Sequence, residues 1–217
     1  ELLVLTVDDS QFNSPKNASK IDSAAEALMS HAHSVPSMQS KSPDQAPSLG
    51  IFAAYLQDES QRAHEAYRNG HKEYARSLFK TMANACVACH SRSPQGSRLN
   101  WNFSTGFARG LPFFQQAELL AAGRSYDAAL TALEKILTDS EIAKKNPYDW
   151  NRALRFALAI SIRVDRSPLR AIAILEKSRR TPGVPQFSKL DMNDWINSLL
   201  AWKREGEKLP RLTEFSL

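Results

Sequence analysis

Cysteine, glycine and long apolar runs are scarce in this chain of 217 residues. Its two cysteines exclude a fold held by several disulfides, and its eight glycines exclude a glycine-rich repeat. The longest apolar run, residues 153–164, is interrupted by Arg155 and Arg163, so we expect no segment that spans a bilayer. Because 42% of the residues are apolar, the chain can still form a packed core, in one domain or in two small ones.

Basic residues exceed acidic ones by a small margin. Lys and Arg number 28 and Asp and Glu 23, which gives a formal net charge of +5. An excess of this size favours an acidic docking partner or an anionic surface. We therefore expect a protein partner that is acidic at its docking face, and no nucleic-acid partner. The arginines in the second half of the chain would line such a docking face or, as is more common, belong to a solvated helix surface. They are Arg152, Arg155, Arg163, Arg166, Arg170, Arg179 and Arg180.

The two cysteines lie at a spacing that has a specific chemical use. The run Cys86-Val87-Ala88-Cys89-His90 places two thiols three residues apart and an imidazole directly after them. This is the attachment pattern of c-type haem, in which each thiol adds to a vinyl group and the histidine binds the iron. A redox dithiol is one alternative, but it needs the start of a helix. A zinc site is another, but it needs more ligands than one cysteine pair and this histidine.

Apolar residues recur along the chain at alternating three- and four-residue steps, which is the period of a helix. The first predicted helix ends before Pro36 and is followed by a connector rich in serine and proline. Gly70 marks a tight turn, and the helix after it ends in the haem motif. Residues 1–18 form an N-terminal arm that we expect to be a strand or an extended segment. The predicted helices cover residues 19–35, 49–68, 72–90, 113–122, 126–137, 150–164, 168–178 and 189–205.

Three stretches share the same helix, turn and helix pattern, and the third consists of residues 150–164 and 168–178 with Asp165-Arg166-Ser167 as the turn. The run from Ala121 to Leu130 resembles the turn region of tetratricopeptide repeats, and residues 66–75 are a more distant version of it. The resemblance implies an all-α fold of helical hairpins, stacked as a bundle or as a short tetratricopeptide-like solenoid. The spacing between repeats, roughly 54 and then 43 residues, is longer than the 34 residues of that family. We expect an N-terminal arm, a haem-binding helical region over 19–110 and a tetratricopeptide-like region over 111–217, packed as one body.

The approach to the haem motif resembles a second family. A glycine turn and a long amphipathic helix that ends in Cys86, Cys89 and His90 are similar to class II cytochromes c, where the motif closes the last helix of a four-helix bundle. The resemblance implies one covalent haem c at a helix C-terminus, with Cys86 and Cys89 as its attachment residues and His90 as the proximal iron ligand. Here, however, the chain continues far beyond the motif.

The position of the turn limits the choice of a sixth iron ligand. His64 and His71 lie beside Gly70, roughly 30 Å from His90 at 1.5 Å per helical residue. Among the remaining candidates we favour His31, which continues the apolar stripe of the first helix and should point inward; an open distal site is the alternative. All the candidates lie near the end of the first helix, level with the haem: Met29, His31, His33 and, on the following loop, Met38.

The loop after the motif combines arginines with aromatic residues. Arg92 and Arg98 would pair with haem propionates while the aromatic side chains exclude water from the haem edge. An ordinary connecting loop whose aromatics fill the core is an equal alternative.

These features together predict a function. We find no catalytic acid and base, so we expect an electron carrier rather than an enzyme, with peroxidase-like activity left open. The favoured function is a monohaem c-type cytochrome whose helical repeats dock a redox partner. A five-coordinate gas-binding or sensory haem and a helical scaffold with a subsidiary haem are the alternatives. Since haem attachment of this kind occurs outside the bacterial inner membrane, we expect a periplasmic or otherwise exported protein whose leader has been removed.

Overall fold

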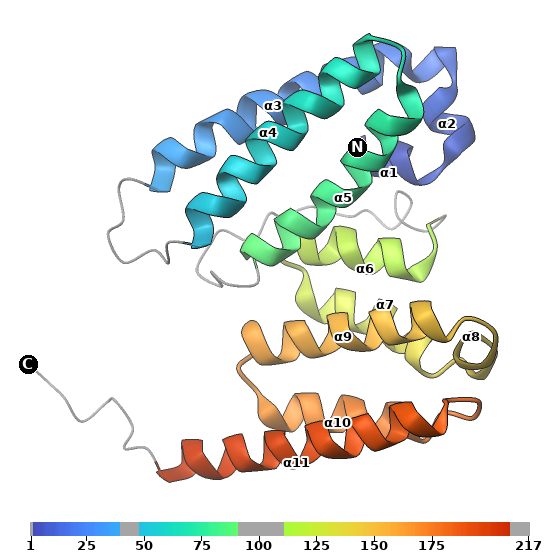
Figure 1. The fold of residues 1–217 in the computed structure, drawn as a ribbon, viewed down its shortest axis with the longest axis vertical. Helices are drawn as coiled ribbons and strands as arrows, with labels where there is room; N and C mark the ends of the chain where they lie inside the picture. Colours follow the sequence, from blue (N-terminus) through green and yellow to red (C-terminus); the bar gives the residue numbers. More distant parts are fainter. Residues whose placement is uncertain (1, 40–47, 91–110, 209–217) are drawn as a thin grey trace, which may run out of the picture. The chain divides into compact units, whose positions relative to one another are not determined.

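The computed structural model describes residues 2–39, 48–90 and 111–208, apart from some side chains within these ranges. Every regular element in the described ranges is a helix, and none is a strand (Figure 1). The predicted all-α fold is therefore confirmed. The chain divides into two compact units, residues 1–125 and 126–217. The boundary between the units lies later than the predicted one at residue 110. The helix Phe113–Ala122 belongs to the first unit because it packs on the helix that ends in the haem motif.

The first unit is built around three long helices. Helix α4 packs against both α3 and α5, and the three run alternately up and down (Figure 1). Shorter helices precede and follow them. The elements of this unit are α1 (Leu2–Val7), α2 (Asp9–Asn13), a 3₁₀ turn (Pro15–Asn17), α3 (Ala18–Gln39), α4 (Ser48–Arg68), α5 (Lys72–His90) and α6 (Phe113–Ala122).

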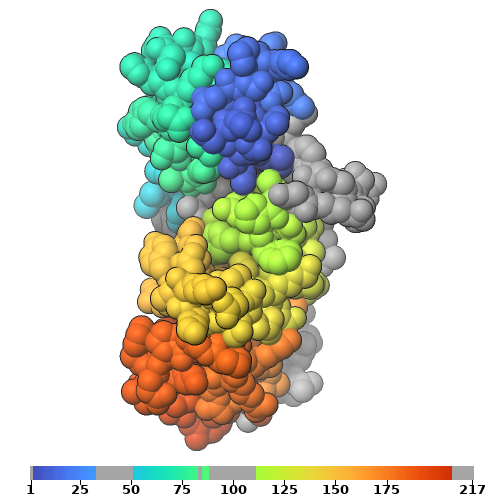
Figure 2. Space-filling model, turned by 90° about the vertical axis from the view of Figure 1, so that its right-hand side faces the viewer, coloured from blue at the N-terminus to red at the C-terminus, as the bar shows by residue number. Residues whose placement is uncertain are grey.

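Residues 2–17 are helical, so the prediction of a strand or an extended arm was wrong. Helix α1 is too short to be stable alone. It forms because its apolar side chains enter the core and because Arg76 binds its last carbonyls, with Nε 2.9 Å from the Thr6 oxygen and Nη2 3.2 Å from that of Val7. The Asp8 carboxylate then caps the start of α2. Figure 2 shows these blue N-terminal helices against the green surface of the helical hairpin.

Helix α3 continues through Pro36 to Gln39, although the sequence predicted an end before the proline. A proline removes only its own N–H bond and crowds one preceding carbonyl. The residues that follow it can keep helical dihedral angles, so a proline near a helix end does not have to be the end. As a result Met38 lies on α3, where a loop was predicted.

The predicted hairpin between residues 49–68 and 72–90 is confirmed as α4 and α5. Gly70 has φ +84°, a left-handed conformation that favours glycine. The His71 N–H bonds the Ala66 carbonyl at 2.9 Å and the Gly70 N–H bonds that of Tyr67 at 3.1 Å, which is the pattern that closes many helices.

The core of the first unit gathers at the turn end of these helices. Phe12 of α2 is fully buried and meets the rings of Tyr67 and Phe79 edge-on, with centroids 5.4 and 6.2 Å away. Apolar residues from five helices share this core, so the N-terminal segment is an integral part of the unit. The buried members are Leu2, Leu5, Phe12, Ile21, Ala25, Ala63, Ala66, Tyr67, Ala75, Phe79 and Met82.

The second unit contains the predicted later helices and one that was not predicted. Trp150 is buried, and its indole N–H donates to the Leu137 carbonyl at 3.1 Å. Asp139 caps the unpredicted short helix α8 by accepting from two of its N–H groups. The elements are α7 (Tyr126–Leu137), α8 (Ser140–Lys145), α9 (Pro147–Arg163), α10 (Pro168–Arg179) and α11 (Gln186–Lys208).

Three turns between consecutive helices share one backbone geometry. Gly70, Arg124 and Arg166 have φ of +84°, +62° and +48°. In each turn the N–H of the next residue bonds a carbonyl in the last turn of the preceding helix, at 2.9, 2.8 and 3.0 Å. The repeated helix, turn and helix pattern predicted from sequence is thus present at all three places.

Candidate functional site

The haem-attachment motif lies at the C-terminal end of α5. The helix runs without interruption to His90, so the predicted position of the motif at a helix end is confirmed. Cys86 is half-buried. Cys89 and His90 also lie on α5, but their side chains are outside the described residues. In a helix, positions i, i+3 and i+4 share one face, so Cys86, Cys89 and His90 belong to the same face of α5.

The direction of α5 bears on the dithiol alternative. A thiolate is stabilised at a helix N-terminus, where the helix dipole is positive, and is disfavoured at the C-terminus. The cysteine pair is at the C-terminal end of α5. This arrangement is unfavourable for a reactive redox dithiol and is compatible with thioether attachment, which needs no thiolate in the mature protein.

The ends of three helices come together where the motif lies. In Figure 1 the C-terminal end of α3, the N-terminal end of α4 and the C-terminal end of α5 lie toward the same end of the first unit. The candidate distal ligands on α3 are therefore at the motif end, as the sequence predicted. His64 and His71 are at the opposite end, beside the turn after α4.

His31 does not point inward as predicted. It is exposed, and its ring Nδ1 donates to the Ala27 carbonyl at 2.5 Å. The apolar stripe of α3 passes from Ile21 and Ala25 to Ala32, which are all buried. The sequence allowed residue 31 or 32 as the next inward position, and packing against α4 selects the alanine. A carbonyl can only accept, so Nδ1 carries the proton and Nε2 is the nitrogen that would bind a metal in the neutral ring.

The structure describes the side chains of only some of the other candidate ligands. Met29 is half-buried on α3. His33 and Met38 also lie on α3, but their side chains are outside the described residues. Met82 of α5 is 1% exposed and belongs to the apolar core. Arg92, Arg98 and the aromatic loop predicted to cover the haem edge lie outside the described residues.

Apolar side chains near the motif end fit a haem. Ile51 and Tyr55, in the first turns of α4, are 71% and 42% exposed. They are one helical turn apart on the same face, and α4 begins at the end of the unit where α5 finishes. Large exposed apolar side chains are costly unless something covers them. A porphyrin held by Cys86 would bring an apolar surface to this part of the unit.

His64 has a role that the sequence analysis did not assign. It is buried, and its Nε2 lies 2.9 Å from Oδ1 of Asp22 on α3. Nothing in the local pattern indicates this contact, which spans 42 residues of the chain.

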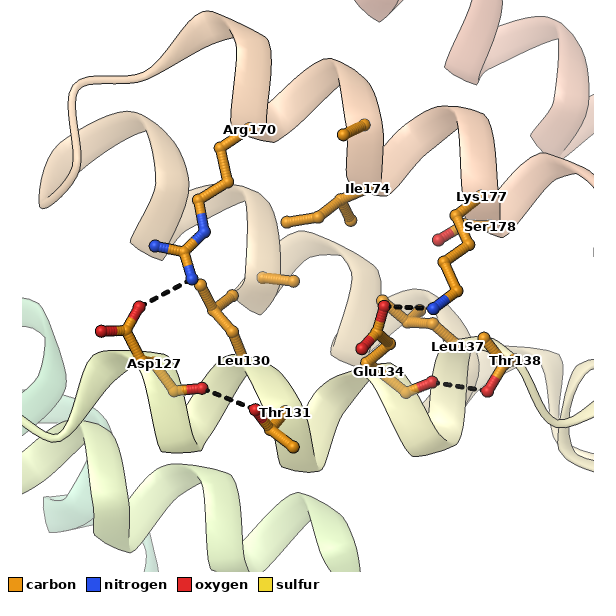
Figure 3. A pocket seen from close by; sticks show the side chains of 12 residues that line it. Asp127, Leu130, Thr131, Glu134, Leu137, Thr138, Arg170, Ile174, Lys177 and Ser178 are labelled. Carbon is orange, nitrogen blue, oxygen red and sulfur yellow. Dashed lines mark hydrogen bonds and ion pairs between the residues drawn. The ribbon is translucent and has the colours of Figure 1, made fainter.

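A groove in the second unit is a further concave feature that was not predicted. It has a volume of about 280 Å³ and lies between α7 and α10, with Ala157 of α9 also in its lining (Figure 3). Asp127 accepts from Arg170 at 2.7 Å at one end, and Glu134 pairs with Lys177 at the other. Both pairs join residues 43 apart. Exposed ion pairs of this kind contribute little individually.

Arg170 also reaches a third carboxyl beside this groove. Its second terminal nitrogen lies 3.0 Å from Asp165. Burial nevertheless raises the pKa of Asp165 above its ordinary value, because the loss of water outweighs the attraction of the guanidinium. Bonding to Asp127 raises the pKa of Arg170.

No metal site was found in the part of the chain that the structure describes. Among those residues, no three or more His, Cys, Asp or Glu side chains come together in a way that would hold an ion. Nor is any described helix sufficiently long and apolar for a membrane span, as the sequence predicted. The chain matches no protein-family model, no curated protein and no solved structure.

Proposed function

We propose that the protein is an exported monohaem c-type cytochrome that carries single electrons. The observation that carries the proposal is the complete attachment motif on one face of the last turns of α5. Cys86 and Cys89 would hold the porphyrin by two thioether bonds, and His90 would bind the iron. When bound, such a group supplies an iron that changes oxidation state by one electron without a bond to a substrate.

The surrounding residues support the proposal through their chemistry. Cys86 is half-buried, and Ile51 and Tyr55 offer apolar contact near the same end of the unit. An apolar surrounding limits the access of water to a haem and so influences its potential. His31 and Met29 lie on the helix that ends at this part of the unit and are the described candidates for a second axial ligand.

The experiment is expression in a host that has the haem-attachment machinery. We expect one covalent haem by intact mass and by the absorption of its pyridine adduct. Cys86→Ser and Cys89→Ser should each lose one thioether, which the pyridine adduct reports as a shifted band. His71→Ala, a histidine at the far end of α5, is the matched control and should retain the full haem. Folded, haem-free protein with a Cys86 to Cys89 disulfide would contradict the proposal.

The same protein tests the two alternative functions. A low-spin haem that does not bind carbon monoxide supports electron transfer. A high-spin haem that binds carbon monoxide would favour the gas-binding alternative instead. If a partner binds the Cys86→Ala, Cys89→Ala double variant as tightly as the holoprotein, the scaffold alternative gains support.

A further inference from the structure

One face of α9 combines arginines with exposed apolar side chains. Five residues of α9 follow one another at steps of four, three, seven and one residues, which places them on one side of the helix. They are Tyr148, Arg152, Arg155, Ile162 and Arg163. All five are exposed, Tyr148 by 73% and Ile162 by 37%. The face extends over about 22 Å at 1.5 Å per residue. The one acidic residue in the sequence of α9 is Asp149, which is half-exposed and lies beside Arg152.

The charge of this face is largely without counterions. Arg155 donates through Nε to the amide oxygen of Asn151 at 3.3 Å, a contact with a neutral group. Arg163 and the exposed Arg166, in the turn that follows α9, make no ion pair with any residue in the described ranges. Three guanidinium groups therefore face solvent along one side of the unit.

The neighbouring helix shows the opposite arrangement. On α10, Arg170 pairs with Asp127 at 2.7 Å, and Arg179 pairs with Glu176 at 2.6 Å. Lys177 is also paired across the groove. The cations of α10 thus stabilise this unit internally, whereas Arg155 and Arg163 of α9 have no acidic partner among the described residues.

The apolar members of the face point to a protein partner. The Arg152 guanidinium lies over the Tyr148 ring, 5.9 Å from its centroid, and also contacts Asp149 at 3.4 Å. Tyrosine and arginine are the residues most often enriched where proteins bind one another, and an apolar residue such as Ile162 adds contact area. Interfaces with nucleic acids are more polar and more positively charged than interfaces between proteins, so the apolar members of this face favour a protein.

We infer that this face of α9, extended by Arg166, docks the acidic surface of a partner protein. Charge complementarity would steer the encounter and orient the two proteins. The inference rests on the proposed function for one point only, that the partner is an electron-transfer protein. The binding itself requires no haem, because the face belongs to the second unit.

The experiment measures binding of a fluorescein-labelled poly-glutamate peptide to the full-length holoprotein by anisotropy at low salt. Reversing three charges, in Arg155→Glu, Arg163→Glu and Arg166→Glu together, should weaken binding about tenfold or more. The matched control reverses three exposed cations of the first unit, Lys16, Arg68 and Lys80, and makes the same change in net charge. That control should weaken binding far less.

Three outcomes would overturn the inference. The first is an equal loss of affinity in both triple variants, which would show that the peptide is attracted by net charge alone. The second is a DNA duplex, or a vesicle of anionic lipid, that binds more tightly than poly-glutamate and is released by the α9 variant. The third is unchanged binding in the α9 variant. If that variant does not fold by circular dichroism, the glutamine triple variant at the same positions replaces it, with the same expectation.

The two proposals fail separately. A chain that carries no haem but binds poly-glutamate through α9 contradicts the proposed function and leaves the docking face in place. A chain that carries haem but binds poly-glutamate equally well with and without the α9 substitutions contradicts the docking face alone.

Discussion

Asp22 of α3 and His64 of α4 form a polar contact between two packed helices, with Oδ1 and Nε2 2.9 Å apart. The histidine side chain is 7% exposed and the aspartate 43%, so the contact lies at the margin of the core. A buried imidazole needs a hydrogen-bond partner, and the carboxylate supplies it. The sequence excluded His64 as a haem ligand on distance, and the structure assigns it a structural role instead.

This contact predicts a measurable coupling. His64→Ala and Asp22→Ala should each reduce the free energy of unfolding, and a double-mutant cycle should show a coupling of about 1 kcal/mol. Urea denaturation of the four proteins measures it. His71→Ala, an exposed histidine nearby in sequence, should change stability by less than about 0.5 kcal/mol. Strictly additive losses at residues 22 and 64 would show that the contact does not stabilise the fold.

The hydroxyl of Tyr67 leads to a second prediction. It is buried and has no hydrogen-bond partner in the described part of the chain. Tyr67→Phe should therefore be neutral or stabilising by up to about 1 kcal/mol, although removal of a buried group usually destabilises. Burial, with a smaller effect of Asp22, also raises the pKa of this phenol. The folded protein then holds the proton above pH 10, where the unfolded chain releases it.

The sign of that effect is testable in alkali. Because the folded state binds the proton more tightly, wild-type stability should fall as the pH rises above about 10, and Tyr67→Phe should lack this part of the loss. Denaturant unfolding from pH 8 to about 11 compares the two proteins. A phenylalanine variant that is clearly less stable at neutral pH would indicate that the hydroxyl has a partner.

Two glycines should respond to alanine in opposite directions. Gly70 has φ +84° and no atom near the added Cβ, so Gly70→Ala should cost about 1 kcal/mol through backbone conformation alone. Gly206 lies within α11 with similar free space but no positive φ, so Gly206→Ala should stabilise by up to about 1 kcal/mol. Thermal unfolding measures both. The same sign for the two variants would contradict the role of the Gly70 turn.

Asp165 predicts a dependence on acid pH. Burial raises the pKa of its carboxyl above 3.8, so the folded state binds this proton more tightly than the unfolded chain. The contribution of Asp165 to stability should fall as the pH rises through the ordinary value toward the raised one. Relative to wild type, Asp165→Asn should therefore become more stable from pH 3 to about 6. A constant difference over that range would show that the pair with Arg170 balances burial, and a change in the opposite direction would show that it outweighs burial.

The distal ligand remains a prediction that spectroscopy can test. If the holoprotein is low-spin, His31→Ala should convert it to a high-spin form that binds carbon monoxide, whereas Met29→Leu and Met38→Leu should not. Absorption spectra of the reduced proteins measure this. The exposure of His31 is compatible with the test, since a haem at this end of the unit would cover part of α3. A low-spin His31→Ala protein would move the assignment to another residue.

Local patterns were sufficient for much of this protein. The spacing of Cys86, Cys89 and His90 predicts haem attachment, which stays a prediction, and the apolar period predicts every long helix. Gly70 predicts the turn between α4 and α5, which the structure confirms. Each of these signals depends on residues within one or two helical turns of one another, where the backbone itself imposes the geometry.

Other features depend on contacts between distant parts of the chain. The apolar, β-branched start of the sequence is typical of a strand, but Arg76, 70 residues away from Thr6, binds the end of α1 and the shared core makes it helical. Packing against α4 places Ala32 inside and His31 outside, although the sequence allowed either. The Asp22 contact with His64 and the two pairs across the groove join residues 42 and 43 apart.

The haem motif therefore follows from local sequence, because its chemistry needs only a few adjacent side chains on one helix face. The surroundings of the motif do not. Which helix ends lie near Cys86, which apolar side chains are exposed there and which face of α9 keeps its charge are decided by packing, since each requires segments that are distant in sequence to meet.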